Sequence, residues 1–295
     1  MIIIQFWCGL GNQMYEYAFY KKICKVYNRN VVFAYWEGGD DHYGYELEKA
    51  FNIHLPFAPA GYVAKYSNFY PQNGKKYWLY SRLFNMRSRV FGDKASFIKP
   101  DDFTEYYPEV FDLSPMYSHY LKGVWANELY FQDIKEEVIS DFVFQNIDVR
   151  NEKLAKELSE TQSVAIHLRR GSYVTDGCYL VGPDFYAKAI EIIKGKVPNA
   201  KFYVFSDDHN EARKIFDGMT EYQLIDHNTG TNSYLDMMLM SKCRHNIITN
   251  STFSFWGAYL NQNPNKIVIG PAYTAAGPAK AGCRNCFSCE GWLKL

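Results

Sequence analysis

The sequence lacks long apolar runs and has no excess of charge of either sign. No stretch comes near the roughly 18 consecutive apolar residues that a membrane-spanning helix requires, so we expect no such helix. Lysine and arginine number 32, as do aspartate and glutamate, and the formal net charge is +0. A neutral chain offers no broad basic surface, which excludes nucleic acid from the expected partners.

A secretion signal is also missing from the start of the sequence. The apolar stretch 1–6 is shorter than the apolar core of a signal peptide, and no basic segment precedes it. The seven cysteines are an odd number, which does not suit a complete set of disulfides. These features predict a cytoplasmic protein with reduced thiols, and peripheral contact with the inner face of the membrane stays open.

Three cysteines stand close together near the C-terminus. Cys283, Cys286 and Cys289 have the spacing C-x2-C-x2-C, which is found in zinc and iron–sulfur sites. A closed site needs a fourth ligand, and none is evident in the neighbouring sequence. We therefore expect thiols without a metal here, with a bound metal as the alternative.

The second half of the chain alternates short apolar segments with helical patterns. With 295 residues, the chain is long enough for two ordinary domains. Strands are expected over 163–168, 201–206, 222–225, 245–249 and 266–270, and helices over 183–194, 209–216, 233–242 and 253–261. This alternation predicts an α/β domain with a parallel sheet that carries helices on both faces. We expect one domain over 1–155 and a second over 156–295.

The first half begins with the same pattern and then becomes irregular. A strand is expected over 1–7, a helix over 15–26 and a second strand over 31–35. Residues 38–115 are rich in Gly, Tyr, Pro and Asp, and we expect this region to hold an acceptor substrate. Helices are expected over 45–51, 76–90, 131–144 and 151–159.

A glycine-containing turn joins the first predicted strand to the first helix. It holds Gly9, Gly11 and Asn12, and backbone amides in such a turn can bind an anion. The dinucleotide motif G-x-G-x-x-G is incomplete because Met14 takes the place of the third glycine, although Glu37 lies near the position of a ribose-binding acid. NAD binding is therefore one alternative. Asn12 could instead bind a sugar or phosphate, or cap the helix.

Two adjacent arginines directly follow the predicted strand 163–168. Burying Arg169 or Arg170 unpaired inside a strand would be costly, whereas at the carboxyl end of a parallel strand both can face a ligand cleft. Guanidinium groups bind phosphate oxygens bidentately, and Gly171 allows close approach of the backbone. The segment predicts an arginine clamp for a pyrophosphate. Structural ion pairs with acidic residues are the alternative.

Polar side chains follow three of the predicted strands of the second domain. They are His167, Arg169 and Arg170; Asp207 and Asp208; and Asn250, Ser251, Thr252 and Ser254. The carboxyl ends of parallel strands meet at one edge of a sheet, so we expect these groups to converge. Hydroxyls and free amides at a helix N-terminus suit phosphate, and a carboxylate suits a base or ribose. The set predicts a nucleoside diphosphate site built without a metal, although Asp and Ser also serve as helix caps.

Three motifs resemble those of glycosyltransferase family 11, the bacterial α-1,2-fucosyltransferases. Residues 8–19 (CGLGNQMYEYAF) resemble the family's G-L-G-N-Q-M-F-Q-Y-A, and residues 167–174 (HLRRGSYV) resemble its H-x-R-R-G-D-Y-V. Residues 234–261 end in NSTFSFWGAYLN, which resembles N-S-T-F-S-W-W-G-A-W-L. The motifs span the chain and are specific as a set, although H-x-R-R alone is shared with other fucosyltransferase families.

The resemblance implies a GT-B-like fold with two Rossmann-like domains that have parallel sheets, the N-terminal one being more irregular. It implies that the C-terminal domain binds GDP-fucose and the N-terminal domain an acceptor, a galactose-terminated oligosaccharide or lipid-linked glycan. The implied reaction is transfer of L-fucose to O2 of the terminal β-galactoside, with inversion and with no metal or other cofactor.

The resemblance also implies roles for individual residues. Arg169 would bind the β-phosphate and stabilise departing GDP, with Arg170 in support. Gly11 would belong to the donor site, and Asn12 would lie near the fucose and the leaving oxygen. The guanine contacts would be His167 and Asp207 or Asp208, and the phosphate contacts Ser251, Thr252 and Ser254, with Asn250 as a further residue of the donor site.

One position departs from the family pattern. The family has Asp where this chain has Ser172, so a carboxylate that acts as base or orients an arginine is missing there. Asp176, four residues on, is the candidate substitute and the third predicted catalytic residue beside Arg169 and Asn12. The departure keeps two alternatives open: transfer of another GDP-sugar or with another linkage, and nucleotide-sugar binding with weak or no catalysis.

Overall fold

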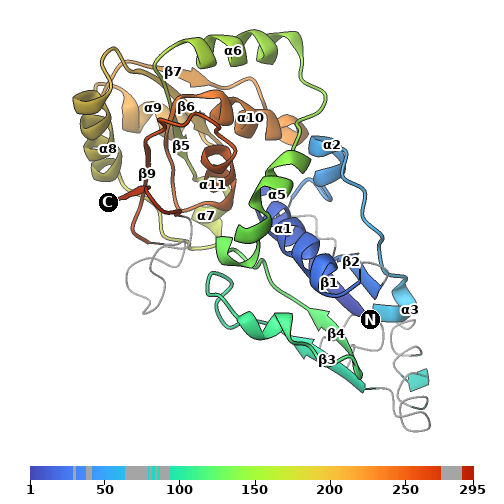
Figure 1. Cartoon of the computed structure of the whole chain (residues 1–295). Helices are drawn as coiled ribbons and strands as arrows, with labels where there is room; N and C mark the ends of the chain where they lie inside the picture. Colours follow the sequence, from blue (N-terminus) through green and yellow to red (C-terminus); the bar gives the residue numbers. More distant parts are fainter. Residues whose placement is uncertain are drawn as a thin grey trace. The chain divides into compact units, whose positions relative to one another are not determined.

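The computed structural model describes residues 1–28, 31–37, 42–63, 94–273 and 288–295, together with residues 79, 82, 83 and 86. Most of the helix expected over 76–90, as well as Cys283 and Cys286, lies outside the described residues. The chain forms two compact units, Met1–Phe142 and Val143–Leu295 (Figure 1). Each contains one parallel sheet, as the α/β prediction required.

A four-stranded parallel sheet in the order β2-β1-β4-β3 forms the centre of the first unit. The elements of this unit are β1 (Ile2–Phe6), α1 (Leu10–Val26), β2 (Val32–Trp36), α2 (Leu47–Phe51), α3 (Ala60–Val63), β3 (Lys94–Ile98), η3 (Pro108–Phe111), β4 (Tyr117–Leu121), η4 (Glu128–Tyr130), η5 (Gln132–Ile134) and α5 (Lys135–Asp141). Strand β3 was not predicted. Helix α1 begins five residues earlier than expected, because the buried Glu46 carboxylate accepts the Leu10 N–H at 2.9 Å and so satisfies an amide of its first turn.

Aromatic side chains fill much of the core of this unit. On one face of the sheet, Ile3 packs with Ala58, Val63 and Tyr120. Elsewhere, the Phe19 ring stacks on Trp125, with centroids 4.3 Å apart, and meets Tyr130 edge-on at 5.2 Å. Many of the aromatic residues of the first half thus serve the packing of the unit.

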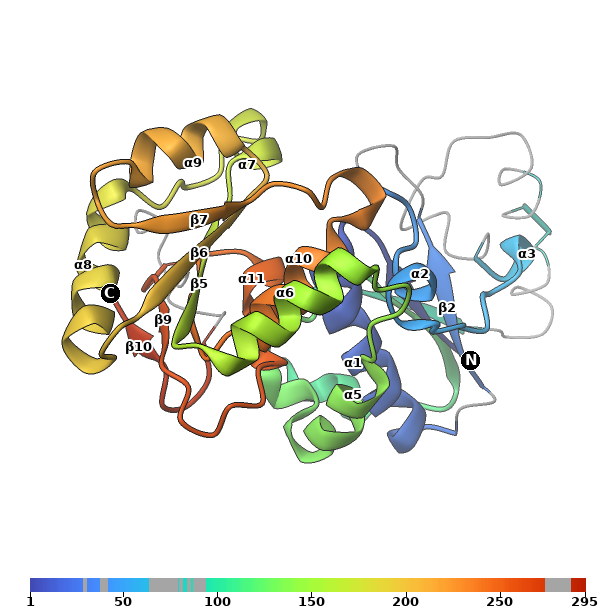
Figure 2. The ribbon, with the colours of Figure 1, turned by 90° about the horizontal axis from the view of Figure 1, so that it is seen from above.

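A six-stranded parallel sheet in the order β10-β9-β8-β5-β6-β7 forms the centre of the second unit. Its elements are α6 (Val149–Glu160), β5 (Ser163–Leu168), α7 (Gly171–Thr175), α8 (Pro183–Lys196), β6 (Lys201–Ser206), α9 (His209–Phe216), β7 (Tyr222–Ile225), η6 (Gly230–Asn232), α10 (Tyr234–Lys242), β8 (His245–Ile247), α11 (Thr252–Tyr259), β9 (Val268–Gly270) and β10 (Leu293–Lys294). Helices α8 and α9 cover one face of the sheet, and α6, α10 and α11 lie on the other (Figure 2). The division between the units falls before α6, ahead of the expected boundary at 155, because α6 packs on α10.

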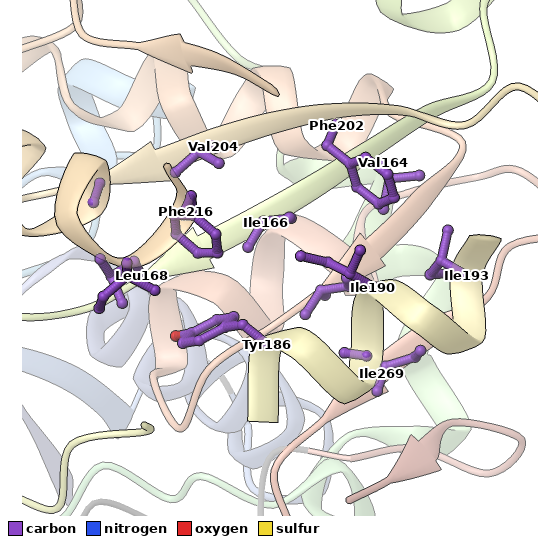
Figure 3. Packing of buried hydrophobic residues seen from close by; sticks show 14 of the residues in the cluster. Val164, Ile166, Leu168, Tyr186, Ile190, Ile193, Phe202, Val204, Phe216 and Ile269 are labelled. Carbon is purple, nitrogen blue, oxygen red and sulfur yellow. The ribbon is translucent and has the colours of Figure 1, made fainter. Parts of the chain in front are cut away.

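The apolar core of the second unit lies between the sheet and helices α8 and α9. Alternate residues of β5, such as Val164 and Ile166, point to this face and meet Tyr186 and Ile190 of α8 (Figure 3). The intervening residues face the other helices, and the His167 ring accordingly lies 5.5 Å from that of Phe253 in α11. This packing fixes the carboxyl end of β5, where the arginines begin.

The helices of the described part of the chain include none with the length and apolar character needed to cross a bilayer.

Candidate active site

The arginines lie at the point where the strand order of the second sheet reverses. From β5 the chain continues to β6 and β7 on one side, and it later returns to place β8 and β9 on the other side. In open α/β sheets, ligands bind beside the carboxyl ends of the strands at this switch point. Arg169 directly follows β5, and α11 begins at Thr252 shortly after β8, so both predicted phosphate-binding segments border this point.

Three side chains hold the guanidinium group of Arg169. Asp207 Oδ2 lies 2.7 Å from Nη1, Ser172 Oγ accepts a hydrogen bond from Nη2 at 2.9 Å, and the group lies 5.3 Å from the ring centre of Tyr173. The Arg169 side chain is nevertheless 25% exposed. Each terminal nitrogen of an arginine carries two N–H donors, so an orientated cation retains donors for an anion.

Arg170 is built into the fold. The residue is buried, and its guanidinium donates to backbone carbonyls, from Nη1 to Arg169 O at 3.0 Å and from Nη2 to Val181 O at 3.1 Å. Its backbone N–H donates to Asp207 Oδ1 at 2.7 Å. These contacts tie the segment that precedes α8 to the end of β5, and a direct contact of Arg170 with phosphate stays a prediction.

The turn after the arginines requires a glycine. Gly171 has φ +22°, and a Cβ atom added there would lie 2.3 Å from Asp207 Oδ2. Any side chain at this position would therefore collide with the carboxylate that holds both arginines. Short helix α7 starts at this residue, in the segment between β5 and α8 where no helix was predicted.

Hydrogen bonds join α7 to the start of α11. Tyr173 Oη donates to Asn250 O at 2.8 Å, and Asn250 Nδ2 donates to Tyr179 O at 2.8 Å. Asn250 is buried and thus links the two sides of the switch point. Its amide contacts were not predicted from the sequence.

The first turn of α11 presents backbone amides to the same region. Ser251 is the N-cap residue, and its side chain makes no capping hydrogen bond. Ser254 is buried, and its hydroxyl is engaged with Thr249 O and Ser251 O, both at 3.1 Å. A helix N-terminus favours an anion through its amides and its dipole, and the phosphate contacts expected of Ser251, Thr252 and Ser254 stay predictions.

His167 is a neutral imidazole at physiological pH. Burial, together with the Arg169 charge, lowers the pKa of His167 to about 3. Its Nδ1 atom is buried and has no hydrogen-bond partner among the described residues. An uncharged ring beside Phe253 suits a neutral ligand group better than a phosphate, in line with the predicted guanine contact, which stays a prediction.

The adjacent aspartates differ in their contacts. Asp207 contacts Arg169 and the Arg170 backbone, whereas Asp208 caps α9 by accepting the Glu211 N–H at 2.9 Å. Asp176 is exposed at the end of α7, where its Oδ1 accepts a hydrogen bond from Thr175 Oγ1 at 3.3 Å. The guanine and base roles expected for Asp208 and Asp176 therefore stay predictions.

The remaining predicted site residues belong to the first unit. Gly11 is buried and Asn12 half-buried in the first turn of α1. Gln13 fixes this turn by donating from Nε2 to Cys8 O at 2.7 Å and Gly44 O at 2.9 Å, and its Oε1 accepts the Glu46 N–H at 2.8 Å. The family motif around Gly11 and Asn12 thus has a rigid backbone at the carboxyl end of β1.

No group of three or more His, Cys, Asp or Glu side chains that could hold a metal occurs within the described residues.

Comparisons with known proteins agree with the motifs. The family model "Glycosyl transferase family 11" matches residues 99–292. An alpha-1,2-colitosyltransferase of Escherichia coli is 30% identical over 276 residues, covering 89% of this chain and 88% of the relative. Galactoside 2-alpha-L-fucosyltransferase Sec1 of Mus musculus is 26% identical over 163 residues, covering 48% and 42% of the two chains.

The fold also has relatives among solved structures. The NodZ alpha-1,6-fucosyltransferase soaked with GDP-fucose has a TM-score of 0.52 to this chain and 13% sequence identity. The match covers 88% of this chain and 92% of that chain. This likeness concerns the fold, and it confirms the predicted GT-B-like class with two parallel sheets.

Proposed function

Because the chain belongs to glycosyltransferase family 11, we propose that it transfers L-fucose from GDP-fucose to O2 of a terminal β-galactoside, forming an α-1,2 linkage. The acceptor is a galactose-terminated oligosaccharide or lipid-linked glycan, and the reaction inverts the anomeric centre without a metal. One observation carries the proposal: a partly exposed Arg169 held in a fixed orientation at the switch point, beside the N-terminus of α11.

In an inverting transfer, Arg169 would stabilise the leaving group. The acceptor hydroxyl attacks the anomeric carbon from the side opposite GDP, and the bond from that carbon to the phosphate oxygen breaks. GDP leaves with the electron pair, through a transition state of oxocarbenium character as in other glycosyl chemistry. Negative charge therefore grows on the β-phosphate, and a preorganised Arg169 stabilises it more in the transition state than in the ground state.

The proton of the acceptor hydroxyl needs a base. Asp176 is the candidate because it is exposed at the end of α7, seven residues after Arg169, where water and an acceptor can reach it. A general base contributes about 10²–10⁴-fold to a rate. The arginine and the helix N-terminus together supply the larger share, through stabilisation of the leaving group.

Similarity to a colitosyltransferase suggests a second candidate for the donor sugar. The colitosyltransferase of Escherichia coli aligns with 89% of this chain, whereas the mouse fucosyltransferase aligns with 48%. Colitose is fucose without its 3-hydroxyl group, so the two GDP-sugars present the same pyrophosphate to Arg169. The choice between them depends on contacts to the sugar, and GDP-colitose is the alternative donor.

A binding and transfer experiment tests the proposal. The thermal stability of the full chain is measured in EDTA with GDP, GDP-fucose, GDP-colitose, UDP-galactose and NAD, since a ligand of the folded state raises the melting temperature. Lactose and each GDP-sugar are then incubated with the protein, and the linkage of the product is determined by NMR. We expect stabilisation by guanine nucleotides alone and an α-1,2-fucosylated product.

Other outcomes distinguish the alternatives. Preferential transfer from GDP-colitose would replace fucose as the donor, and a different linkage would change the assignment of the acceptor position. GDP binding without transfer to any galactoside would support a binding protein, as the serine at position 172 allows. Stabilisation by NAD, or dependence on a divalent metal, would contradict the proposal.

A further inference from the structure

A single carboxylate joins the two arginines of the site, and it comes from the neighbouring strand. We propose that Asp207 positions Arg169 for the phosphate, in place of the acidic side chain that the family motif has at position 172. This inference rests on the proposed function, because it concerns the orientation of the arginine that would bind the donor. It assigns Asp207 to the phosphate side of the site instead of the guanine.

The register of the sheet places Asp207 beside Arg169. Strands β5 and β6 are parallel neighbours, and Leu168 pairs with Ser206 at their carboxyl ends. The residue that directly follows each strand is Arg169 after β5 and Asp207 after β6. Their adjacency is thus a property of the paired strands and does not depend on a flexible loop.

Both oxygens of the carboxylate are engaged. Asp207 Oδ2 lies 2.7 Å from Arg169 Nη1, and Oδ1 accepts the Arg170 backbone N–H at 2.7 Å. Two bonds in different directions fix the plane of the carboxylate, which in turn fixes the guanidinium group. A charged acceptor makes a stronger hydrogen bond to arginine than a neutral one does.

Gly171 provides the space for this arrangement. A Cβ atom at this position would lie 2.3 Å from Asp207 Oδ2, so the carboxylate occupies the volume that a side chain would need. The glycine of the motif and the aspartate that follows β6 are therefore sterically linked. Only a residue without a side chain at 171 allows Asp207 to reach both arginines.

Ser172 supplies a neutral contact on the other side of the guanidinium. Its hydroxyl accepts from Arg169 Nη2 at 2.9 Å, and it carries no charge to balance the arginine. The charge balance of Arg169 among the described residues thus comes from Asp207. Because both side chains of the pair are about a quarter exposed, the pair contributes little to stability, and its effect lies in orientation.

The test compares four variants of the full chain. Asp207→Asn keeps an oxygen for the Arg170 N–H but removes the charge beside Arg169, and Ser172→Asp restores a carboxylate from the other side. The double variant Asp207→Asn/Ser172→Asp carries one carboxylate, at the family position. The control is Asp226→Asn. Asp226 belongs to another Arg–Asp pair of the same unit, in which its Oδ2 lies 3.6 Å from Arg213 Nη2.

Steady-state rates with the accepted GDP-sugar, GDP titration calorimetry and melting temperatures are measured for each variant. We expect Asp207→Asn to lower kcat by about 10²-fold, the cost of misplacing a catalytic group by about 1 Å. A smaller rise in KM is expected, with the melting temperature close to that of the unmodified protein. The double variant should recover most of the lost kcat, and Asp226→Asn should keep full activity.

Several results would overturn the assignment. Unchanged kcat in Asp207→Asn would show that Ser172 and Tyr173 suffice to orient the arginine. If the double variant did not recover the kcat that Asp207→Asn loses, Asp207 would be a structural residue. The same conclusion would follow if the loss of kcat came with a lower melting temperature in both variants that carry Asp207→Asn. An unmodified protein that binds no guanine nucleotide would instead contradict the proposed function, so the two failures are separable.

Discussion

The two units share one architecture, but different residues lie at the carboxyl ends of their strands. In the second unit, β5 is followed by two arginines, one of which is partly exposed and held by Asp207. In the first unit, β1 is followed by Trp7 and a glycine-containing turn, and the charged groups beside it are mostly acidic. A parallel sheet therefore determines where a ligand can bind, whereas the residues that follow its strands determine which ligand.

Carboxylates of the first unit accept hydrogen bonds near the end of β1. Glu16 is buried and accepts the Trp7 N–H at 3.1 Å, and burial raises the pKa of its carboxyl well above the usual value. Glu37 accepts from Lys122 Nζ at 3.2 Å and also from Gln5 Nε2. An edge of this kind offers oxygen atoms that can accept hydrogen bonds from the hydroxyls of an uncharged sugar.

An aromatic ring accompanies these acidic groups. Lys122 Nζ lies 5.3 Å from the ring centre of Trp7 while it pairs with Glu37, so the cation is already balanced. Rings beside polar groups suit the apolar faces and hydroxyls of a sugar. The proposed function accordingly assigns the donor phosphates to the second unit and the acceptor sugar to the first, and this division stays a prediction.

The largest expected effect follows from removal of the Arg169 guanidinium group in the second unit. Arg169→Ala should lower kcat by about 10³-fold, the upper range for removal of one preorganised donor, and should also weaken GDP binding. Arg169→Lys should recover little, because an ammonium group lacks the planar pair of donors. Steady-state kinetics and GDP calorimetry measure both effects.

Arg213→Ala serves as the control for this prediction. Arg213 is another arginine of the second unit, paired with Asp226 and about half exposed. It should retain the activity and GDP affinity of the unmodified protein. Near-normal turnover in Arg169→Ala would contradict the assignment of phosphate binding to Arg169, since the arginine would then be structural.

The second prediction concerns the ion pair between Lys122 and Glu37 in the first unit. Lys122→Met keeps most of the apolar stem but leaves Glu37 unbalanced in a largely buried position, where breaking an ion pair costs about 3–5 kcal/mol. We expect a lower melting temperature, with GDP affinity unchanged at temperatures where the variant is folded. Thermal unfolding and GDP calorimetry on the same sample measure the two quantities.

The paired variant Lys122→Met/Glu37→Gln checks the cause of this loss. It removes both charges and should regain most of the stability, because no unbalanced carboxylate remains. A Lys122→Met variant with normal stability but weak GDP binding would reverse the comparison, since the first unit would then hold the phosphates.

The same difference between the units explains how much the sequence could predict. In the second unit each strand is a short apolar segment, and Pro183 marks the start of a helix, so elements β5 to β9 were placed correctly with small errors at their ends. In the first unit β3 lies in a stretch rich in Gly, Tyr and Pro, where a five-residue strand has no clear alternation. Packing against β4 creates that strand, and packing is not visible in local sequence.

The site was predictable in its parts and less so in its contacts. The arginines and the Asn-Ser-Thr segment were recognised because they directly follow apolar strands, where ligands of open α/β sheets bind. The pairing of Arg169 with Asp207 depends on β6 lying next to β5, and strand order is not encoded in any local pattern. The one available signal was Gly171, which indicated a close approach of some group without identifying it.

The smallest expected effect concerns a carboxyl group that anchors the turn of the first unit. Burial raises the pKa of Glu46 to about 7, against hydrogen bonding from the Leu10 N–H and the charge of Lys49, which lower it. The folded state therefore binds a proton more tightly than the unfolded chain, and the free energy of unfolding falls as pH rises from about 4.5 to about 7.

Glu46→Gln should remove this loss, because glutamine keeps an oxygen for the Leu10 N–H and has no charge to bury. Relative to the unmodified protein, the variant should gain little at pH 4.5 and at most about 3.5 kcal/mol by pH 8, as one pKa unit is worth about 1.4 kcal/mol. Urea unfolding across this pH range measures the difference, with Glu136→Gln, an exposed residue of α5, as a control that should show none. A gain that is equal at both pH values would mean that the proton on Glu46 does not link the stability of the turn to pH.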